Sequence, residues 1–332
     1  MSISHASPLR PQVPTQDPLP SLLKAAGDAL RLDILRLMAR DSFGVLELCQ
    51  LLDCKQSGMS HHLKVLTQAG LLTWRREGNS IFYRRAYLAL APDKSLAALQ
   101  QQLFATLDAQ PLSDTLAQRL QQIRRERGRA SRDFFVHNAD KFRTQQDLIA
   151  SYPVYAEQVN QLLINTPLPG RGLALEVGPG EGEFLIPLAG RFERVIALDN
   201  AANMLERART LALDEGLDNI DFILDDTRRL PRERWRADCV IANMVLHHTP
   251  SPASIFQDLS AALRPGGALL ITDLCRHEQS WAREACGDLW QGFEPQDLSR
   301  WALDAGLREG QSVYFALRNG FQVQLRQFFQ LQ

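Results

Sequence analysis

Apolar residues recur every three or four positions between residues 22 and 69. This period is that of a helix with one buried face, and polar breaks divide the stretch into four short helices. We expect them at about residues 22–26, 28–38, 43–52 and 56–69. Because isolated helices of this length are marginal in water, the pattern predicts a compact helical unit in which they pack on one another.

The hydrophobic period changes after the fourth helix. Residues 72–76 and 80–85 form strand-like runs on either side of Gly78-Asn79, which predicts a β-hairpin. Short helices that end in such a hairpin are typical of a winged helix-turn-helix. Residues 94–127 return to the helical period and predict two further helices, whose apolar faces need a partner.

After residue 170, short continuous apolar runs alternate with helical segments. Such runs are typical of strands buried on both faces of a parallel sheet, and the alternation predicts βαβ units. A terminal hairpin turns at Asn319-Gly320. The fold class of this part is therefore α/β, with strands expected at residues 172–177, 194–198, 220–224, 238–242 and 267–273.

Composition limits the kind of protein. The 332 residues suit about two domains of ~100 to 200 residues each. No apolar run approaches the ~20 residues of a membrane span, and the N-terminus lacks the pattern of a signal peptide. We therefore expect a cytoplasmic protein without membrane contact. Five scattered cysteines without a C-x-x-C pair argue against a disulfide framework.

Charge and proline are distributed unevenly along the chain. Residues 1–130 carry 17 Lys+Arg against 11 Asp+Glu, whereas residues 131–332 carry 20 against 27. A basic front and an acidic back indicate that only the front meets a polyanion. Five prolines fall between residues 8 and 20, and they predict a disordered arm over residues 1–20.

The stretch ALEVGPGEGEF, residues 174–184, carries the strongest chemical signal. Glu176 lies near the end of a buried strand, where a carboxylate is costly to bury, so we expect it to face a polar ligand. Gly178, Gly180 and Gly182 remove side chains where the backbone turns sharply and a ligand approaches. A dinucleotide-binding fingerprint would instead need its third glycine at position 183, which is a glutamate.

An acid followed by three alternating glycines resembles the nucleotide loop of S-adenosylmethionine (SAM)-dependent methyltransferases with a Rossmann-like fold. The resemblance implies a seven-stranded mixed sheet with helices on both faces, and SAM or S-adenosylhomocysteine (SAH) as the ligand. It implies that Asp199 accepts both ribose hydroxyls, that Asn200 and Met204 flank the adenine, and that Asn243 lines the methionyl end. The segment SRDFFVHNADKF resembles the lead-in of such enzymes, and Phe142 is our candidate for an aromatic lid over the cofactor.

Two alternatives remain for the residue that accepts a hydrogen bond from the adenine amino group. The resemblance places Asp226 and Thr227 at the position of the acid that accepts this group. A slip of one residue would make Asp225 the ligand instead. Both alternatives lie in FILDDTRRLP, just after the third expected strand.

The segments LLKAAGDALRLDILRLM and SGMSHHLKVLTQAGLLTWRREGNSIFYR resemble the ArsR-type family of dimeric bacterial repressors over about residues 20–88. The resemblance implies a homodimer that binds a double-stranded DNA operator, with the helix after the wing joining the first helix in the dimer interface. Short polar side chains on the recognition helix would read base edges: Gln56, Ser57, Ser60 and His61. Basic side chains would contact phosphates: Lys64, Arg75, Arg76 and Arg84.

Many ArsR-type proteins sense metals through cysteines on their third helix. Aligning VLELCQLL with that motif puts Gly44 and Leu46 at the two thiolate positions and leaves only Cys49. A single sulfur cannot make a soft-metal site, so we expect no metal in this chain.

The domain organisation expected from these features has four parts. They are an arm at 1–20, a winged-helix DNA-binding domain at 21–90, a helical dimerisation and linker segment at 91–130, and a methyltransferase-like domain at 131–332. Arginines at 124, 125, 127 and 129 are interpreted as a basic hinge of the linker.

Three functions fit this organisation. The first is a transcriptional regulator that senses SAM or SAH. The second is an active SAM-dependent methyltransferase that acts on a small molecule and regulates its own operon. Its catalytic candidates are His247 and His248, which follow the fourth strand and lie on the side where an acceptor would bind. A plain methyltransferase that is only dimerised by its winged helix is disfavoured by the polar recognition helix and the basic wing.

Overall fold

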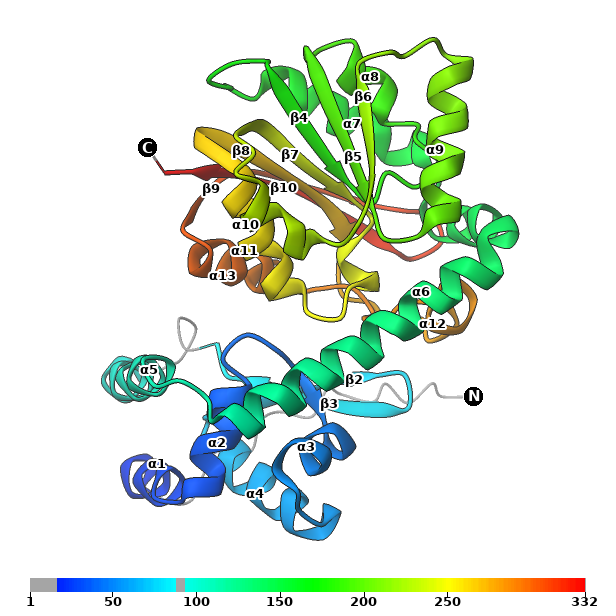
Figure 1. Cartoon of the computed structure of the whole chain (residues 1–332). Coiled ribbons are helices and arrows are strands. Elements are labelled where there is room, and N and C mark those ends of the chain that lie inside the picture. Colours follow the sequence, from blue (N-terminus) through cyan, green and yellow to red (C-terminus); the bar gives the residue numbers. More distant parts are fainter. Residues whose placement is uncertain (1–16, 88–92, 332) are drawn as a thin grey trace, which may run out of the picture. The chain divides into compact units, whose positions relative to one another are not determined.

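The computed structural model describes residues 17–87 and 93–331, apart from the side chains of residues 139–143 and 284. The chain divides into two compact units (Figure 1). Of the described residues, 17–76, 80–87 and 93–120 belong to the first unit, and 77–79 and 121–331 belong to the second. Within the described residues, no helix is both long enough and apolar enough to cross a membrane.

The first unit contains the expected helices and hairpin. Its sheet has the order β1-β3-β2, and β3 is antiparallel to the two-residue strand β1. The third helix begins after that strand, two residues later than expected. The elements are α1 (Pro18–Ala26), α2 (Ala29–Leu37), β1 (Phe43–Gly44), α3 (Val45–Leu52), α4 (Gln56–Gln68), β2 (Leu72–Glu77), β3 (Ser80–Arg85) and α5 (Lys94–Asp108).

Fully buried side chains of four helices and the short strand β1 form the core of the first unit. Arg85 of β3 ties this core to α5, because its guanidinium donates to Leu35 O at 2.8 Å and to both carboxylate oxygens of Asp108 at 2.8 and 2.7 Å. The core includes Leu22, Ile34, Leu35, Met38, Phe43, Leu48, Leu51, Met59, Leu63 and Leu66.

The expected disordered arm ends earlier than residue 20. Helix α1 begins at Pro18, and the Asp17 side chain caps it by accepting from Leu19 N at 3.1 Å. Proline fits the first turn of a helix, where its missing N–H would have no partner in any case. The prolines at 18 and 20 therefore belong to a helix, while residues 1–16 lie outside the described residues.

The expected linker is the interior of one long helix. Helix α6 runs from Asp114 to Ala150 over 37 residues and contains every arginine of the supposed hinge. The expected domain boundary at 130/131 therefore falls inside α6, and the two units instead meet along the chain at residues 120 and 121. Arg, Gln and Glu are good helix formers, so this polar stretch can continue the helix between the buried Ile123 and Ile149.

The second unit is built on a seven-stranded sheet with the order β6-β5-β4-β7-β8-β10-β9. The first five strands are parallel and β10 is antiparallel to both of its neighbours, which confirms the expected mixed sheet. The strands are β4 (Leu173–Val177), β5 (Arg194–Asp199), β6 (Ile220–Leu224), β7 (Ala237–Asn243), β8 (Leu263–Leu274), β9 (Leu307–Ala316) and β10 (Gln322–Gln330).

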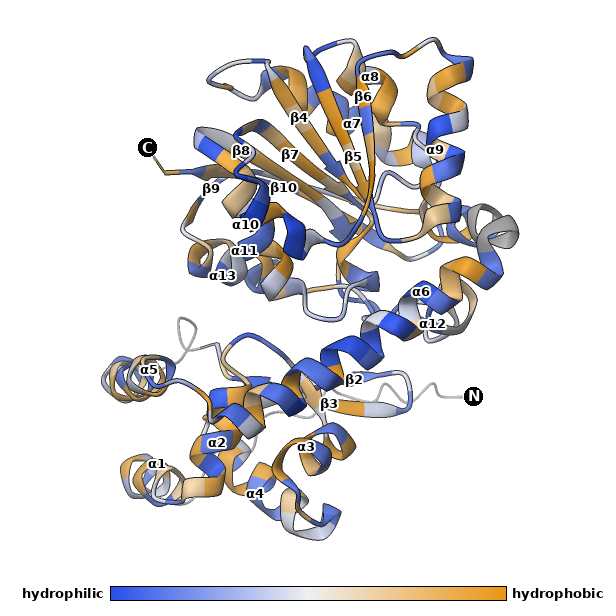
Figure 2. Cartoon of the chain, in the orientation of Figure 1, coloured by the Kyte–Doolittle hydropathy of each residue, from blue (hydrophilic) through white to orange (hydrophobic). Residues whose placement is uncertain are grey.

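Helices cover both faces of this sheet, as expected. Strands β4, β5 and β7 are largely hydrophobic along their length (Figure 2), as strands buried on two faces must be. One face packs against α7, α8 and α9. On the other face Phe256 of α11 contacts Phe328 of β10 and Trp301 of α13. The helical elements are α7 (Tyr152–Asn165), α8 (Leu185–Ala189), α9 (Ala202–Asp214), η2 (Thr227–Arg229), α10 (Leu230–Glu233), η3 (Leu246–His248), α11 (Pro252–Ala262), α12 (Trp281–Cys286) and α13 (Pro295–Asp304).

The continuity of α6 can be tested with a proline at an exposed interior position. Arg125→Pro removes a helical N–H and introduces a clash with the carbonyl four residues earlier, so we expect a loss of about 3 kcal/mol in unfolding free energy. Arg125→Ala is the matched control and should change it by less than about 0.5 kcal/mol. Urea denaturation followed by far-ultraviolet circular dichroism measures both variants. Equal stability of the two would mean that residue 125 lies in a linker.

Candidate functional site

The ends of β4 and β7 define the position of the site. The chain passes from β4 to β5 and β6 on one side of the sheet, then returns to β7 and β8 on the other side (Figure 1). The strand order therefore reverses between β4 and β7. In open parallel sheets, ligands bind at such a switch point, beyond the carboxyl ends of the strands.

The glycine loop begins directly after β4. All three of its glycines have positive φ, 65° at Gly178, 60° at Gly180 and 91° at Gly182, a region that other residues rarely adopt. A Cβ at Gly178 would lie 2.6 Å from Val245 Cγ2, and one at Gly182 would lie 2.9 Å from Ala208 Cα. A Cβ at Gly180 would meet no described atom within 4 Å. The first and third glycines thus allow close packing, while the second faces open space.

Glu176 is buried at the end of β4, with 2% of its surface exposed. Its Oε1 accepts from Asn243 Nδ2 at 3.5 Å, and Asn243 Oδ1 accepts from Thr272 Oγ1 at 2.8 Å. Its Oε2 has no hydrogen-bond partner among the described residues. Burial raises the pKa of Glu176 to about 8, although the Asn243 hydrogen bond lowers it. The carboxyl group therefore holds a buried acceptor that a cationic or donor ligand group could satisfy.

Asp199 ends β5, next to the glycine loop. Gly178 N donates to Leu198 O at 2.9 Å, and the Asp199 side chain accepts from Ala201 N at 2.8 Å. Burial raises the pKa of Asp199 to about 6, and the backbone N–H groups of Ala201 and Asn200 lower it. Asn200 is exposed. These backbone groups orient the side chain, and a carboxylate has further lone pairs with which it can accept from a ligand.

Met204 lies in a small cluster at the start of α9. It is 3% exposed and packs with Ala201 against two aromatic side chains of α6, Phe134 and Phe135. Asn203 Nδ2 also donates to Phe135 O at 2.9 Å. The sequence analysis predicted an aromatic lid in this segment and named Phe142 as the candidate. The side chain of Phe142 lies outside those described. The repeated Phe-Phe was the available signal, but choosing among three phenylalanines requires knowing which of them face α9.

The residues after β6 differ in what they contact. Asp225 N donates to Asp199 O at 3.0 Å, so this loop lies beside the end of β5. Asp226 forms an ion pair with Arg228, whose hydrogen bond holds the pKa of Asp226 below its usual value. The buried Thr227 donates to Asp258 at 2.7 Å. Asp226 and Thr227 thus already have partners within the chain. Asp225, the alternative, is exposed and also has partners, since it pairs with Arg229 at 3.4 Å and accepts from Asp226 N at 2.8 Å.

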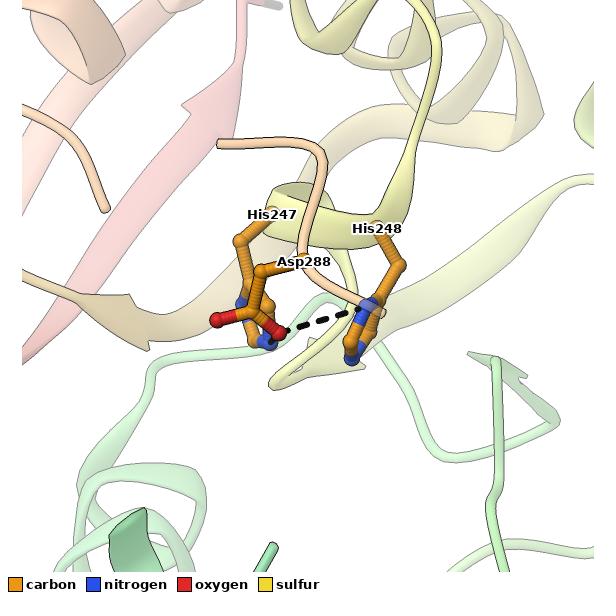
Figure 3. A group of neighbouring side chains, drawn as sticks. All are labelled: His247, His248 and Asp288. Carbon is orange, nitrogen blue, oxygen red and sulfur yellow. Dashed lines mark ion pairs between the residues drawn. The ribbon is translucent and has the colours of Figure 1, made fainter. Parts of the chain in front are cut away.

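His247 and His248 lie side by side in η3, just after β7, and both are buried (Figure 3). His247 Nδ1 lies 2.8 Å from Asp273 Oδ1, and its Nε2 lies 3.8 Å from Asp288 Oδ1. His248 Nδ1 lies 3.4 Å from Gly287 O and 3.7 Å from the same oxygen of Asp288. The His248 ring also contacts the edge of Phe135, with ring centroids 5.0 Å apart.

The pKa values of the two histidines are shifted in opposite directions. Burial lowers the pKa of His247, but the charges of Asp273 and Asp288 outweigh that effect and raise it. Burial and the neighbouring His247 hold the pKa of His248 well below its usual value. The lowered pKa favours the neutral imidazole of His248, and it also makes this imidazole a weaker base than an unperturbed histidine.

The sequence predicted no metal site, but the fold brings three side chains that can bind a metal close together. One atom each of His247, His248 and Asp288 lies within 4.8 Å of the other two. Asp288 is separated from the histidines by 40 residues of chain and lies in no motif. Sequence reasoning therefore missed it, and no local signal could have found it.

In the first unit, α4 carries the predicted base-reading residues on its exposed face. Gln56, Ser57, Ser60 and His61 are exposed, as is Lys64. Met59, Leu63 and Leu66 on the opposite face are fully buried. The helix therefore has one face that packs on the core and one that could enter a groove.

The predicted phosphate contacts of the wing need one correction. Arg76 is exposed and Arg84 is half-buried, but Arg75 is only 6% exposed. Successive side chains of a strand point to opposite faces, so Arg75 and Arg76 of β2 cannot share one surface. Arg75 is therefore removed from the set of candidate phosphate contacts.

Comparison with known proteins agrees with this division. A helix-turn-helix domain family matches residues 27–74, and a methyltransferase domain family matches residues 174–267. Ubiquinone biosynthesis O-methyltransferase of Erwinia tasmaniensis is 28% identical in a match that covers 45% of this chain and 68% of that protein. The protein of the same name from Coxiella burnetii is 26% identical over 40% of this chain and 62% of its own length. About a third of each relative therefore lies outside the match.

A solved structure shares the fold of the second unit. It is a complex of the Haloferax volcanii Trm112 methyltransferase activator with a candidate methyltransferase, and the similar chain has a TM-score of 0.50 at 16% identity. The similarity covers 60% of this chain and 98% of that one. The chain thus combines a helix-turn-helix domain with a methyltransferase domain on a seven-stranded mixed sheet.

Proposed function

We propose that this protein is an ArsR-type transcriptional regulator that binds a double-stranded operator as a homodimer and senses SAM or SAH through its methyltransferase domain. One observation carries the proposal. The chain contains both a helix with an exposed polar face, α4, and a glycine loop that begins next to a buried acceptor, Glu176 Oε2. The first feature suits DNA and the second suits a nucleotide-like ligand with a cationic end.

The residues of the switch point fit SAM along its length. Glu176 and Asn243 take the methionyl end, where the ligand's ammonium group can satisfy Oε2 of the carboxylate. Gly178, Gly180 and Gly182 let the backbone approach the ligand, and Asp199 accepts the ribose hydroxyls. Asn200 and Met204 flank the adenine, with Phe135 beside Met204. Asp226, Thr227 or Asp225 accepts the adenine amino group.

The DNA contacts divide by chemistry. Gln56, Ser57, Ser60 and His61 read base edges, because their short polar side chains lie on the exposed face of α4. Lys64, Arg76 and Arg84 contact phosphates, which supplies affinity that falls with salt but no sequence choice. A homodimer presents two such surfaces to two half-sites of an operator.

Helix α6 is the element that can couple the two ligands. It begins in the first unit at Asp114 and continues to Ala150 in the second, where Phe134 and Phe135 pack on the start of α9. A ligand that shifts Met204 or Asn203 acts directly on this helix. A coupling of about 1 to 3 kcal/mol would change DNA affinity by about 5- to 150-fold.

An active methyltransferase is the second candidate function. The relatives named above are called O-methyltransferases, and His248, whose pKa is held well below its usual value, lies just after β7 with its ring against Phe135. A small-molecule acceptor with a hydroxyl group would lose its proton to this base while the methyl group is transferred. Methyl transfer depends chiefly on positioning, so the reaction would need little else from the protein.

The decisive experiment is fluorescence anisotropy on DNA from upstream of the protein's own gene, with SAM, with SAH and with neither. Salt is held fixed, because phosphate contacts dominate the affinity. A sensor should show affinities that differ between SAM and SAH by about 5- to 150-fold. Tight DNA binding that neither ligand alters would refute the sensor and direct the search to a methyl acceptor.

The cofactor site itself is tested with Asp199→Ala. Losing hydrogen bonds to a charged acceptor costs about 1.5 to 3 kcal/mol each, so SAM should bind at least about tenfold more weakly by isothermal titration calorimetry. Asp214→Ala, at the exposed end of α9, is the control and should leave the affinity unchanged. Wild-type affinity in Asp199→Ala would remove this residue from the site.

Base reading is tested with Ser60→Ala and His61→Ala in one chain. Operator choice should relax, so the ratio of specific to nonspecific affinity falls while nonspecific binding stays constant. Lys64→Ala is the contrasting variant, which should weaken binding to all sequences alike and reduce the salt slope by about one. A footprint of the double variant identical to that of the wild type would exclude Ser60 and His61 from base contacts.

A further inference from the structure

The buried histidine pair just after β7 forms part of a polar cluster whose four members come from three parts of the second unit. His247 and His248 belong to η3, Asp273 lies near the end of β8, and Asp288 follows α12. All four side chains are at most 8% exposed. Such groups are costly to bury, so their arrangement needs a physical account.

Asp273 fixes the orientation of His247. Its carboxylate accepts from Leu246 N at 2.9 Å and from Leu274 N at 2.7 Å, so it cannot rotate freely. This fixed carboxylate lies 2.8 Å from His247 Nδ1 and holds that nitrogen as a donor. The lone pair of a neutral His247 is then on Nε2, which faces Asp288. A carboxylate behind a histidine in this way is the usual support of a metal-binding imidazole.

Asp288 supplies the third ligand. Its side chain is 1% exposed, and neither carboxylate oxygen has a hydrogen-bond partner among the described residues. Its Oδ1 lies 3.8 Å from His247 Nε2 and 3.7 Å from His248 Nδ1 (Figure 3). Hydrogen bonds to these nitrogens would be about 2.8 Å long. Two ligands of one tetrahedral zinc ion are about 3.4 Å apart, since each lies about 2.0 to 2.2 Å from the metal.

We propose that His247, His248 and Asp288 bind one divalent transition-metal ion, with Asp273 as the support of His247. Two imidazoles and one carboxylate suit borderline cations such as zinc, cobalt or iron(II) better than calcium or magnesium. Three protein ligands leave a coordination position for water or for an oxygen atom of a bound acceptor. The proposal does not depend on SAM or DNA binding, and its test uses neither.

The test is zinc titration of the metal-stripped, untagged full-length protein, followed by calorimetry and by elemental analysis after dialysis. The wild type should retain about one zinc ion per chain. Asp288→Asn and His248→Asn should each bind at least about 100-fold more weakly, and Asp273→Asn about 10- to 100-fold more weakly. His137→Asn, an exposed histidine of α6, is the control and should bind like the wild type. Equal affinity of Asp288→Asn and wild type would overturn the proposal.

A second measurement covers variants that fail to fold. Cobalt(II) added to the stripped wild type should give visible absorption of a four-coordinate site, and a chelator should remove it and lower the thermal midpoint. If the cluster is only an imidazolium held between two aspartates, cobalt gives no such spectrum and the chelator leaves the midpoint unchanged. That result would overturn the proposal without any substitution.

Discussion

The burial of one carboxyl group, Glu176, is the constraint around which the second unit is arranged. Glu176, Asn243 and Thr272 form a chain of hydrogen bonds that links the ends of β4, β7 and β8 across the switch point of the sheet. The pKa of Glu176 rises from 4.5 to about 8 on folding. Between these values the unfolded chain has released the proton and the folded chain keeps it, so this group's contribution to stability falls as pH rises. A ligand ammonium group beside Oε2 would stabilise the ionised form of Glu176 and so restore the stability that is lost as pH rises. Binding of the proposed ligand would therefore stabilise the fold.

The parts of the fold that local patterns encode were predictable. The glycine loop and the parallel strands follow from residues adjacent in sequence, because a positive φ or a buried strand leaves a local mark. The start of α1 at Pro18 and the burial of Arg75 also have local causes, namely the first turn of a helix and the alternation of a strand. The first part of α6 was predicted as a helix, but its continuation past residue 127 was not, because so polar a stretch resembles a linker when only its hydrophobic pattern is considered.

The parts that depend on tertiary packing were not predictable from one sequence. Phe135 is close to Met204 and His248 only because α6 passes beside α9 and η3. Asp288 reaches the histidines from a loop 40 residues away. Neither contact could be predicted, because a single sequence shows which residue types could bind a ligand but not which residues lie close together in the fold.

The two roles proposed for His248, a catalytic base and a metal ligand, require different things of the same ring nitrogens. A histidine nitrogen has one lone pair, which can accept a proton or coordinate a metal but cannot do both. If His248 Nδ1 coordinates a cation with Asp288, only its other nitrogen can act as a base, and that nitrogen then carries a proton. Metal binding would therefore remove His248 as a resting base and leave the cation to lower the pKa of an acceptor hydroxyl. A sensor needs neither role, so a buried, charge-balanced cluster in a protein without turnover would act as a structural centre between β7, β8 and α12.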